Sequence, residues 1–390
     1  MSPLCQTHIE PANRTAMEPF YPLHTYVCSR CFLVQLPEHV SPAAIFEEYA
    51  YFSSYSDTML EHARNYVDAI TARLHLGAAS SVVELASNDG YLLQYFVQRG
   101  IPVLGIEPAR NVARVAVSKG IPTLSAFFGR DTARQLVSER GQADLILGNN
   151  VLAHVPDIND FVGGMRLLLK PDGVITMEFP HLLRLIERNQ FDTIYHEHFS
   201  YLSFTTVERI FAAQGLTLFD VEEIQNHGGS LRIYARQQEA TSRPVSAAVA
   251  ALKEYEEVWG VSRLPPYQAF GEHVKETKRR ILQFFIDAKR QGKTVVGYGA
   301  PGKGNTLLNY CGIREDFLSF TVDRNPYKQG KFTPGTRIPI CSPERIRDVR
   351  PDYLFVLVWN LLDEVMRQNA FIREWGGKFV SPIPALTIHD

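Results

Sequence analysis

The densest group of side chains able to move a proton is the segment from Tyr195 to His198, with sequence Tyr-His-Glu-His. It follows an apolar run that ends at Glu178–His181, so we expect it at the carboxyl edge of a parallel sheet, where open α/β folds bind ligands. An imidazole with an unperturbed pKa near 6.5 is partly available as a base at neutral pH. We predict His198 as a general base that Glu197 or Tyr195 orients, with His154 facing the same site.

Two other interpretations of this segment stay open. A metal site is possible in principle, but His196 and His198 stand two residues apart and do not match the helical pattern of two histidines four residues apart. The second alternative is a surface loop without a chemical role, in which His196, His198 and His181 have ordinary hydrogen-bond partners.

A second candidate site is the turn after the predicted strand at 81–87. The strand stops at small polar residues and enters a helix, which leaves backbone N–H groups for a ligand. About twenty residues later Glu107 ends the next strand and can accept both hydroxyls of an adenosine ribose. The single glycine suits a diphosphate poorly, whereas Glu84, Asp89 and Glu107, with no basic residue expected nearby, suit a cationic sulfonium.

We therefore predict S-adenosylmethionine rather than NAD as the cofactor. The alternatives are an ordinary turn and, for Glu107, an acid at a helix N-terminus. The predicted cofactor-binding residues are Glu84, Ala86, Ser87, Asn88, Gly90, Glu107, Pro108, Asn149 and Asn150.

A third candidate site is the glycine-rich turn at 297–306. Its glycines would let backbone N–H groups approach a diphosphate, and Lys303 adds charge. Asp323 ends the next predicted strand, and Lys328 and Lys331 follow it. We predict a nucleotide diphosphate clamp. The alternative is a domain with only a packing role, in which Trp359 fills the core instead of stacking on a base.

The elements that must position these residues follow from the alternation of apolar runs with amphipathic segments. Strands are expected at 81–87, 103–107, 144–150 and 173–179 with helices between them, which predicts a parallel sheet covered on both faces. A hairpin at 216–222 and 231–236 should add an antiparallel edge. Residues 242–292 read as helical, and a second alternating series follows.

Composition sets the broad class. The 390 residues, 45% of them hydrophobic, allow two or three domains. The chain has 40 basic and 42 acidic side chains. It therefore lacks the net positive charge that would attract nucleic acid or an anionic membrane. The chain has no apolar stretch of membrane-spanning length, no secretory signal at its start, and five scattered cysteines that argue against a disulfide framework. We expect a cytoplasmic protein, monomeric or homodimeric, with a small-molecule substrate.

Five segments together resemble the sugar-nucleotide C-methyltransferases of deoxysugar biosynthesis, the group that builds mycarose and tetronitrose. The resemblance spans nearly the whole chain. It implies a zinc-binding head, a central class I methyltransferase domain of Rossmann-like fold that binds S-adenosylmethionine, and a second Rossmann-like domain at the carboxyl end. The matching segments are Cys28–Leu36, Glu84–Gly90, Gly105–Pro108, Tyr195–Phe199 and Gly228–Arg232.

The resemblance also implies a substrate and residue roles. The substrate would be a dTDP-linked 4-keto-deoxysugar methylated at C-3′. His198 matches the family's base, and Tyr195, Glu197, His154 and Tyr51 match its other active-site positions. The predicted substrate-binding residues are Gly299, Pro301, Lys303, Asn305, Asp323, Lys328 and Arg232. The predicted domains are a head at 1–75, the methyltransferase domain at 76–240, and a helical linker with the nucleotide-sugar domain at 241–390.

The head departs from the family pattern of two Cys-x-x-Cys pairs. Only Cys28 and Cys31 form such a pair here, and two thiolates alone rarely hold zinc. Either the sequence begins late, or Cys5 or His8 substitutes, or the metal is lost. We expect a short head without zinc.

The expected reaction begins with a carbanion. A C-4′ ketone acidifies the C-3′ hydrogen, His198 removes it, Tyr195 or His154 stabilises the enolate oxygen, and the sulfonium methyl transfers in line. The rivals are an O- or N-methyltransferase acting on a sugar nucleotide, an NAD-dependent sugar-nucleotide oxidoreductase, and a non-catalytic module that senses a sugar nucleotide.

Overall fold

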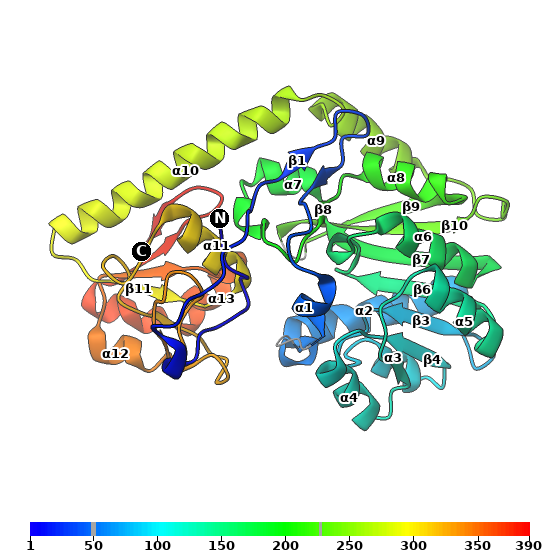
Figure 1. Cartoon of the computed structure of the whole chain (residues 1–390), viewed down its shortest axis with the longest axis horizontal. Coiled ribbons are helices and arrows are strands. Elements are labelled where there is room, and N and C mark those ends of the chain that lie inside the picture. Colours follow the sequence, from blue (N-terminus) through cyan, green and yellow to red (C-terminus); the bar gives the residue numbers. More distant parts are fainter. Residues whose placement is uncertain (48–51, 226–227) are drawn as a thin grey trace. The chain divides into compact units, whose positions relative to one another are not determined.

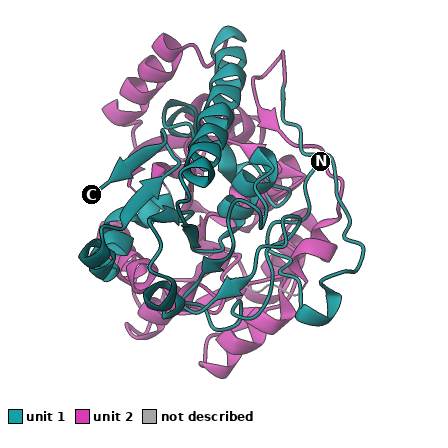
Figure 2. Cartoon of the chain, turned by 90° about the vertical axis from the view of Figure 1, so that its left-hand side faces the viewer, with its two compact units in different colours: residues 1–27, 183–197, 263–390 teal, residues 28–182, 198–262 magenta. Residues whose placement is uncertain are grey.

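The computed structural model describes residues 1–47, 52–225 and 228–390 (Figure 1). These residues form two compact units, each assembled from separate stretches of the chain (Figure 2). Unit 1 contains residues 1–27, 183–197 and 263–390, and unit 2 contains residues 28–182 and 198–262. The division differs from the predicted boundaries because the first 27 residues belong with the carboxyl-terminal sheet.

Unit 2 is built on a seven-stranded sheet with the order β5-β4-β3-β6-β7-β10-β9. The first five strands in that order are parallel, and β10 runs antiparallel to both β7 and β9. The parallel sheet and the antiparallel hairpin are confirmed, with the later strand of the hairpin beside β7 and the earlier one at the edge. The strands are β3 (Val82–Leu85), β4 (Val103–Ile106), β5 (Thr123–Leu124), β6 (Ala143–Asn149), β7 (Leu169–Pro180), β9 (Leu216–Ile224) and β10 (Ser230–Gln237).

Helices cover both faces of this sheet, as its continuous apolar strands require. In β6, Ile146 belongs to one hydrophobic core while its neighbours Leu145 and Leu147 belong to another, since successive side chains point to opposite faces. Phe161 of α6 packs in the first core and Phe96 of α3 in the second. The helices of unit 2 are α1 (Pro42–Phe46), α2 (Asp57–Leu74), α3 (Leu93–Val97), α4 (Arg110–Ser118), α5 (Arg130–Arg140), α6 (Ile158–Leu168), α8 (Phe204–Ala213) and α9 (Ala247–Trp259).

Short elements complete unit 2. Strand β2 (Val34–Gln35) pairs antiparallel with β8 (Ser200–Tyr201), which ties the head to the segment just after His198. The 3₁₀ helix η2 (Ser53–Tyr55) precedes α2, and η3 (Leu152–His154) follows β6.

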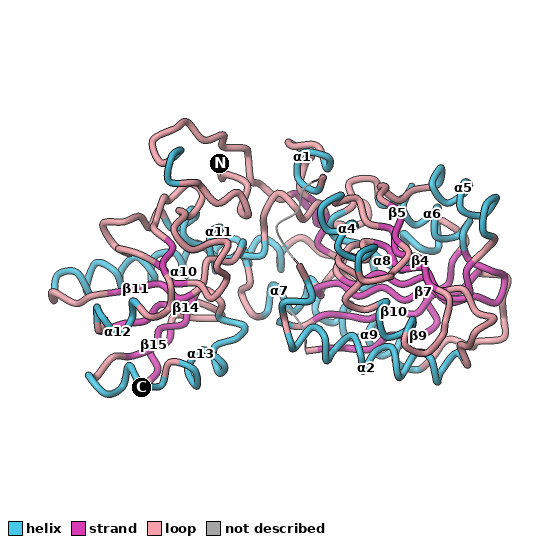
Figure 3. The backbone as a smooth tube through the Cα atoms, turned by 90° about the horizontal axis from the view of Figure 1, so that it is seen from below, coloured by secondary structure: helices cyan, strands magenta, loops and turns pink. Residues whose placement is uncertain are grey.

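Unit 1 is built on a six-stranded sheet with the order β13-β12-β11-β14-β15-β16, parallel except for β16. This sheet, with the helices drawn around its strands in Figure 3, confirms a second Rossmann-like domain. Its strands are β11 (Val295–Tyr298), β12 (Thr321–Val322), β13 (Ile340–Cys341), β14 (Tyr353–Val356), β15 (Lys378–Ser381) and β16 (Thr387–His389).

The remaining elements assigned to unit 1 lie outside this six-stranded sheet. They are β1 (Tyr26–Val27), η1 (Pro11–Asn13), α7 (Leu182–Glu187), η4 (Phe191–Thr193), α10 (Pro265–Arg290), α11 (Gly302–Cys311), α12 (Arg345–Val349), η6 (Trp359–Leu361), α13 (Leu362–Gln368) and η7 (Ala370–Trp375). No helix within 1–47, 52–225 and 228–390 combines the length and apolar character needed to cross a lipid bilayer.

The amino-terminal segment is held to unit 1 by backbone pairing. Ile9 and Phe332 exchange two N–H···O bonds of 2.9 Å, and the amide of Asn305 donates to the carbonyl of Cys5 at 2.7 Å. The Glu18 carboxylate accepts the N–H of Gly335. The first residues of the chain are therefore part of the carboxyl-terminal fold.

Candidate active site

The turn after β3 has the backbone of a ligand-binding loop. Ala86, Asn88 and Gly90 have φ values of 56°, 50° and 76°. For a residue with a side chain such as Ala86 this conformation costs about 1–3 kcal/mol, and it persists only where the surroundings hold it. Gly90 has a left-handed φ of 76°, and a Cβ there would also lie 2.3 Å from Cδ1 of Ile121, so the position favours glycine.

Glu107 fixes this turn against the end of β4. Its two carboxylate oxygens accept the backbone N–H groups of Asn88 at 2.9 Å and Ala109 at 2.8 Å. Burial raises the pKa of Glu107, and the two backbone donors act in the opposite direction. A carboxylate has about four acceptor positions, so capacity for ribose hydroxyls remains, as its predicted role requires.

Four buried polar atoms around the turn have no hydrogen-bond partner among the described residues. Such atoms are rare because an unpaired buried donor or acceptor costs about 1–3 kcal/mol. They gather at the carboxyl ends of the neighbouring strands β3 and β6. The four are Oε2 of Glu84, Oγ of Ser87, Oδ1 of Asp89 and Nδ2 of Asn149.

This set of unpaired atoms fits a ligand that carries positive charge and hydrogen-bonding groups. Burial first, and then the nearby charges of Glu107 and Asp89, raise the pKa of Glu84 well above its usual range. A cationic group would relieve that repulsion. The residues present therefore suit S-adenosylmethionine, whose sulfonium and ammonium groups are both cationic.

One expectation about the turn is wrong. Asp89 does have a basic neighbour, because Nζ of Lys119 lies 2.9 Å from its Oδ2, and Ser54 also donates to that oxygen. Asn88 is engaged as well, since its side-chain oxygen accepts the N–H of Ser53 at 2.9 Å. The segment around η2 thus holds the turn, a contribution that the sequence did not indicate.

Of the other predicted cofactor residues, Pro108 is half-buried at the end of β4 and Asn150 follows β6. Asn150 has a φ of 57°, and its N–H donates to the carbonyl of Glu178 at 2.8 Å. Both residues lie at the same carboxyl edge as Glu84 and Glu107.

His198 and His154 lie in contact within unit 2. Their ring centroids are 4.6 Å apart in an edge-to-face arrangement, and Phe46 packs edge-on against His154 at 5.6 Å. His198 is only 9% exposed, with the ring of Tyr201 at 6.1 Å. The N–H of Phe199 donates to the carbonyl of Ala153 at 2.8 Å, which holds the two histidine-bearing segments side by side.

The rest of the Tyr-His-Glu-His segment belongs to unit 1. Oε1 of Glu197 accepts a hydrogen bond from the Cys5 thiol at 3.5 Å, and burial followed by this carboxylate raises the pKa of Cys5. His196 is only 3% exposed, and its ring contacts the carbonyl of Pro22 at 3.1 Å. Tyr195 is half-buried, and Tyr51 lies outside the described residues.

His181 is also a partnered core histidine. Its Nε2 lies 2.8 Å from Oε1 of Glu256, and both side chains are fully buried. Glu256 also accepts the N–H groups of Phe204 and Thr205 at the start of α8. The pair therefore joins the end of β7 to α8 and α9.

The cysteine pair of the head forms a tight turn. The N–H of Phe32 donates to the carbonyl of Cys28, and the backbone N–H groups of Cys31 and then Arg30 lower the pKa of the Cys28 thiol. Among the described residues no group of three or more His, Cys, Asp or Glu side chains is placed to hold a metal ion.

Cys5 and His8, the two suggested substitutes, have partners in unit 1. The ring of His8 contacts the carbonyl of Ala300 at 3.3 Å, and burial lowers its pKa to about 4. Cys5 donates to Glu197. Neither contact supports a role as a replacement zinc ligand.

The glycine-rich turn after β11 is largely closed by the protein itself. Oδ2 of Asp323 accepts the N–H of Ala300 at 2.8 Å, and Nζ of Lys328 donates to the Ala300 carbonyl at 3.0 Å. A Cβ at Gly302 would lie 2.9 Å from Sγ of Cys5, so the amino-terminal segment packs closely against the start of α11.

The predicted diphosphate clamp therefore has several contacts within unit 1, and its role in binding a nucleotide stays a prediction. Asn305 donates to the Cys5 carbonyl, and Gly299, with a φ of 92°, serves the turn itself. Pro301 lies within the turn, whereas Asp323 and Lys328 follow β12 and bond to Ala300 of the turn. Lys303 is the exception, because it reaches Asn360 and Trp359 after β14.

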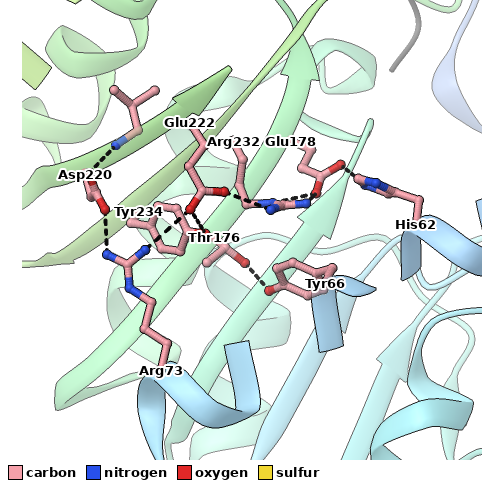
Figure 4. A network of polar contacts seen from close by, with 10 residues as sticks. His62, Tyr66, Arg73, Thr176, Glu178, Asp220, Glu222, Arg232 and Tyr234 are labelled. Atoms are coloured by element: carbon pink, nitrogen blue, oxygen red, sulfur yellow. Dashed lines mark hydrogen bonds and ion pairs between the residues drawn. The ribbon is translucent and has the colours of Figure 1, made fainter. Parts of the chain in front are cut away.

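Arg232 is part of an ion network and not a free substrate ligand (Figure 4). Its Nε donates to Glu178 at 2.7 Å and its Nη1 to Glu222 at 2.9 Å, while the guanidinium lies over the ring of Tyr66. His62 contacts the other oxygen of Glu178 at 2.8 Å. These bonds, with His62 first, lower the pKa of Glu178 against the effect of burial.

Comparison with known proteins agrees with this architecture. Residues 225–384 match a family model described as a C-methyltransferase C-terminal domain, and residues 59–221 match one described as a methyltransferase domain. Residues 1–46 match a model described as "Putative zinc binding domain".

Individual relatives match to different extents. C-methyltransferase NovU of Streptomyces niveus is 38% identical over 367 residues, which cover 94% of this chain and 87% of NovU. A ubiquinone biosynthesis O-methyltransferase of Rhodopseudomonas palustris is 28% identical over 101 residues, 26% of this chain and 40% of that protein.

Among solved structures, magnesium protoporphyrin IX methyltransferase from Synechocystis with bound SAM aligns with a TM-score of 0.35 and 14% identity, over 49% of this chain and 86% of that one. The match to NovU extends over both sheets and the residues between them. The chain therefore belongs to the family of S-adenosylmethionine-dependent C-methyltransferases.

Proposed function

We propose that this C-methyltransferase methylates C-3′ of a nucleotide-linked 4-keto-deoxysugar, with dTDP as the nucleotide. The observation that carries the proposal is the buried contact between His198 and His154 in the unit that holds the cofactor residues. The two imidazole rings lie 4.6 Å apart, so one site offers both a base for a C–H proton and a second group that can hydrogen-bond to the neighbouring oxygen. A neutral imidazole is the base that C–H deprotonation needs.

Within this proposal the cofactor residues hold the methyl donor, which supplies an electrophilic methyl group on a sulfonium. Glu84 and Asn149 present unpaired polar atoms to it, and Glu107 accepts its ribose hydroxyls. His198 takes the C-3′ proton, and His154 donates to the enolate oxygen that forms at C-4′. General-base assistance of this kind contributes about 10²- to 10⁴-fold in rate.

Tyr195, Glu197 and Tyr51 remain proposed active-site residues on the strength of the resemblance. Tyr195 is an alternative donor to the enolate oxygen, and Glu197 is already hydrogen-bonded by Cys5. The dTDP-sugar, a cytoplasmic location and a monomeric or homodimeric state are likewise proposals. The similarity to a C-methyltransferase gives no support to the NAD-dependent rival.

Hydrogen exchange at carbon tests the proposal. A dTDP-linked 4-keto-deoxysugar incubated with the enzyme in D₂O, without methyl donor, should gain deuterium at C-3′, detected by proton NMR. His198→Asn should abolish the exchange, and His39→Asn, a change at an exposed head histidine, should leave it intact. Methylation of oxygen or nitrogen without C-3′ exchange would show that the chain acts on a heteroatom instead.

A further inference from the structure

A buried ion pair stands at the carboxyl end of β7, outside the residues assigned to the cofactor and to the base. His181 directly follows β7, and Glu256 lies in α9. Nε2 of His181 is 2.8 Å from Oε1 of Glu256, and both side chains are fully buried. Burial acts to raise the pKa of Glu256, but hydrogen bonds from His181 and Thr205 lower it below its usual value. The carboxylate is therefore ionised and only accepts, so Nε2 of His181 is the donor.

The carboxylate of Glu256 has no acceptor position left over. A carboxylate accepts about four hydrogen bonds. Besides the one from His181, Glu256 accepts the N–H of Phe204 at 2.7 Å and the N–H and hydroxyl of Thr205 at 2.8 and 2.6 Å. These residues begin α8, which already has an N-cap in Ser203. Glu256 therefore does more than cap a helix, because it ties the start of α8 to α9 and to the end of β7.

The segment that begins α8 is the one that carries His198. On its way there the backbone of Phe199 bonds to η3, and β8 pairs with β2. The N–H of Leu182, the residue after His181, then donates to the carbonyl of Leu202 at 3.0 Å. The end of β7 thus holds this segment twice, once by its backbone at Leu202 and once through the ion pair at the start of α8. All of these residues belong to unit 2.

A buried ion pair is a costly way to hold two elements together. The desolvation of both charges offsets much of their attraction, and an apolar pair of similar volume is often equally stable or more stable. The same segments supply Leu202, Phe204 and Leu252 to the hydrophobic core. What the ion pair adds to this core is direction, since hydrogen bonds have preferred lengths and angles. The pair therefore specifies one position for residues 198–205.

We infer that His181 and Glu256 are positioning residues that hold the ring of His198 in place to take the C-3′ proton. The inference rests on the proposed function, in which His198 is the base. A misplacement of about 1 Å, even one caused far from the reacting atoms, can cost about 10²-fold in rate. Neither member of the pair is assigned a contact with substrate or cofactor, because both act through the backbone that carries His198.

The test compares Glu256→Gln with Glu254→Gln, the same change at an exposed position of α9. Glutamine keeps the shape of Glu256 but has one acceptor oxygen in place of two, so it cannot accept from α8 and from His181 as before. In Glu256→Gln, turnover and deuterium exchange at C-3′ should fall by the same factor, about tenfold or more. The substrate KM and the calorimetric S-adenosylmethionine affinity should stay within about twofold. Glu254→Gln should match the parent chain in all of these quantities.

Two changes at His181 separate the hydrogen bond from the rest of the ring. His181→Gln can still donate an amide N–H to Glu256 and should recover most of the parent turnover, whereas His181→Leu cannot and should be as slow as Glu256→Gln. Val249→Ala, at a buried position of α9, is the control for a general loss of packing. It should lower the urea midpoint without lowering turnover per folded molecule. A merely structural pair would make Glu256→Gln and His181→Leu behave like Val249→Ala, which would overturn the inference.

The possible results separate the inference from the proposed function. Parent-like turnover and exchange in folded Glu256→Gln and His181→Leu would overturn the inference and leave the function standing. A parent chain that methylates oxygen or nitrogen and shows no exchange at C-3′ would overturn both. If neither variant folds, Thr205→Val, which removes only the hydroxyl contact with Glu256, should still slow the exchange, and an unchanged rate would then overturn the inference.

Discussion

Replacing Glu84 by glutamine should affect cofactor binding and protein stability in opposite directions. Glu84 stands one residue before the end of the buried strand β3, is 1% exposed, and has a carboxylate oxygen with no partner among the described residues. Its pKa is raised by burial and by Glu107 and Asp89, so the folded protein binds a proton more readily there than the unfolded chain does. The stability of the parent chain should therefore fall as the pH rises above about 4.5.

Glutamine has the same shape and no charge, so Glu84→Gln should not show this fall. At pH 8 we expect the free energy of unfolding to rise by roughly 1–3 kcal/mol, the range for an uncompensated buried polar atom. S-adenosylmethionine affinity should drop by about 2 kcal/mol, or roughly 30-fold, since a hydrogen bond to a charged partner is worth about 1.5–3 kcal/mol.

Urea titrations from pH 5 to pH 8 measure the stability, and calorimetry measures the affinity. Cofactor binding to the parent chain should also release a proton, seen as a dependence of the binding heat on the ionisation enthalpy of the buffer, and Glu84→Gln should not release it. Glu61→Gln, at an exposed position of α2, is the control and should change neither quantity. A Glu84→Gln protein with undiminished cofactor affinity would refute the assignment of Glu84 to a cationic ligand.

Three further changes have definite expected outcomes. His198→Asn should lower turnover about 10²- to 10⁴-fold with little change in calorimetric S-adenosylmethionine affinity, and unaltered turnover would exclude it as the base. Arg232→Met should cost about 3–5 kcal/mol in urea unfolding, because Glu178 keeps a buried charge without its partner, and a smaller loss would show that His62 alone compensates it. Gly302→Ala should increase the alkylation rate of Cys5, which is 3% exposed, and an unchanged rate would mean that the close contact relaxes without moving the amino-terminal segment.

The sequence predicted the parts of the fold that depend on local periodicity. Strands β3, β4, β6 and β7 of the unit 2 sheet fall where the apolar runs predicted them, because strands buried on both faces must be continuously apolar. The turn after β3 and Glu107 were also found, since both stand directly at strand ends. His154 and His198 were expected to share a site, and their rings are in contact.

The parts that the sequence did not reveal depend on partners far away in the chain. The hydrogen bond from Trp359 to Asp192 could not be predicted, because the two residues are 167 positions apart in the sequence. Arg232 was predicted as a substrate ligand, because the sequence does not show that it donates a hydrogen bond to Glu178, 54 residues earlier. The glycine turn was predicted from its composition. Its close packing against Cys5 was not predicted, because no local pattern connects these two parts of the chain.

The pairing of Ile9 with Phe332 has a consequence for how the protein is made. All strands of the large sheet in unit 2 lie between residues 82 and 237, so that sheet is complete in sequence well before the ribosome reaches the end of the message. The first residues to leave the ribosome can form their backbone pairing only after Phe332 has been synthesised. Domains generally fold as units during synthesis, so a nascent chain halted after residue 262 should already bind the methyl donor while its leading segment is still open to proteases.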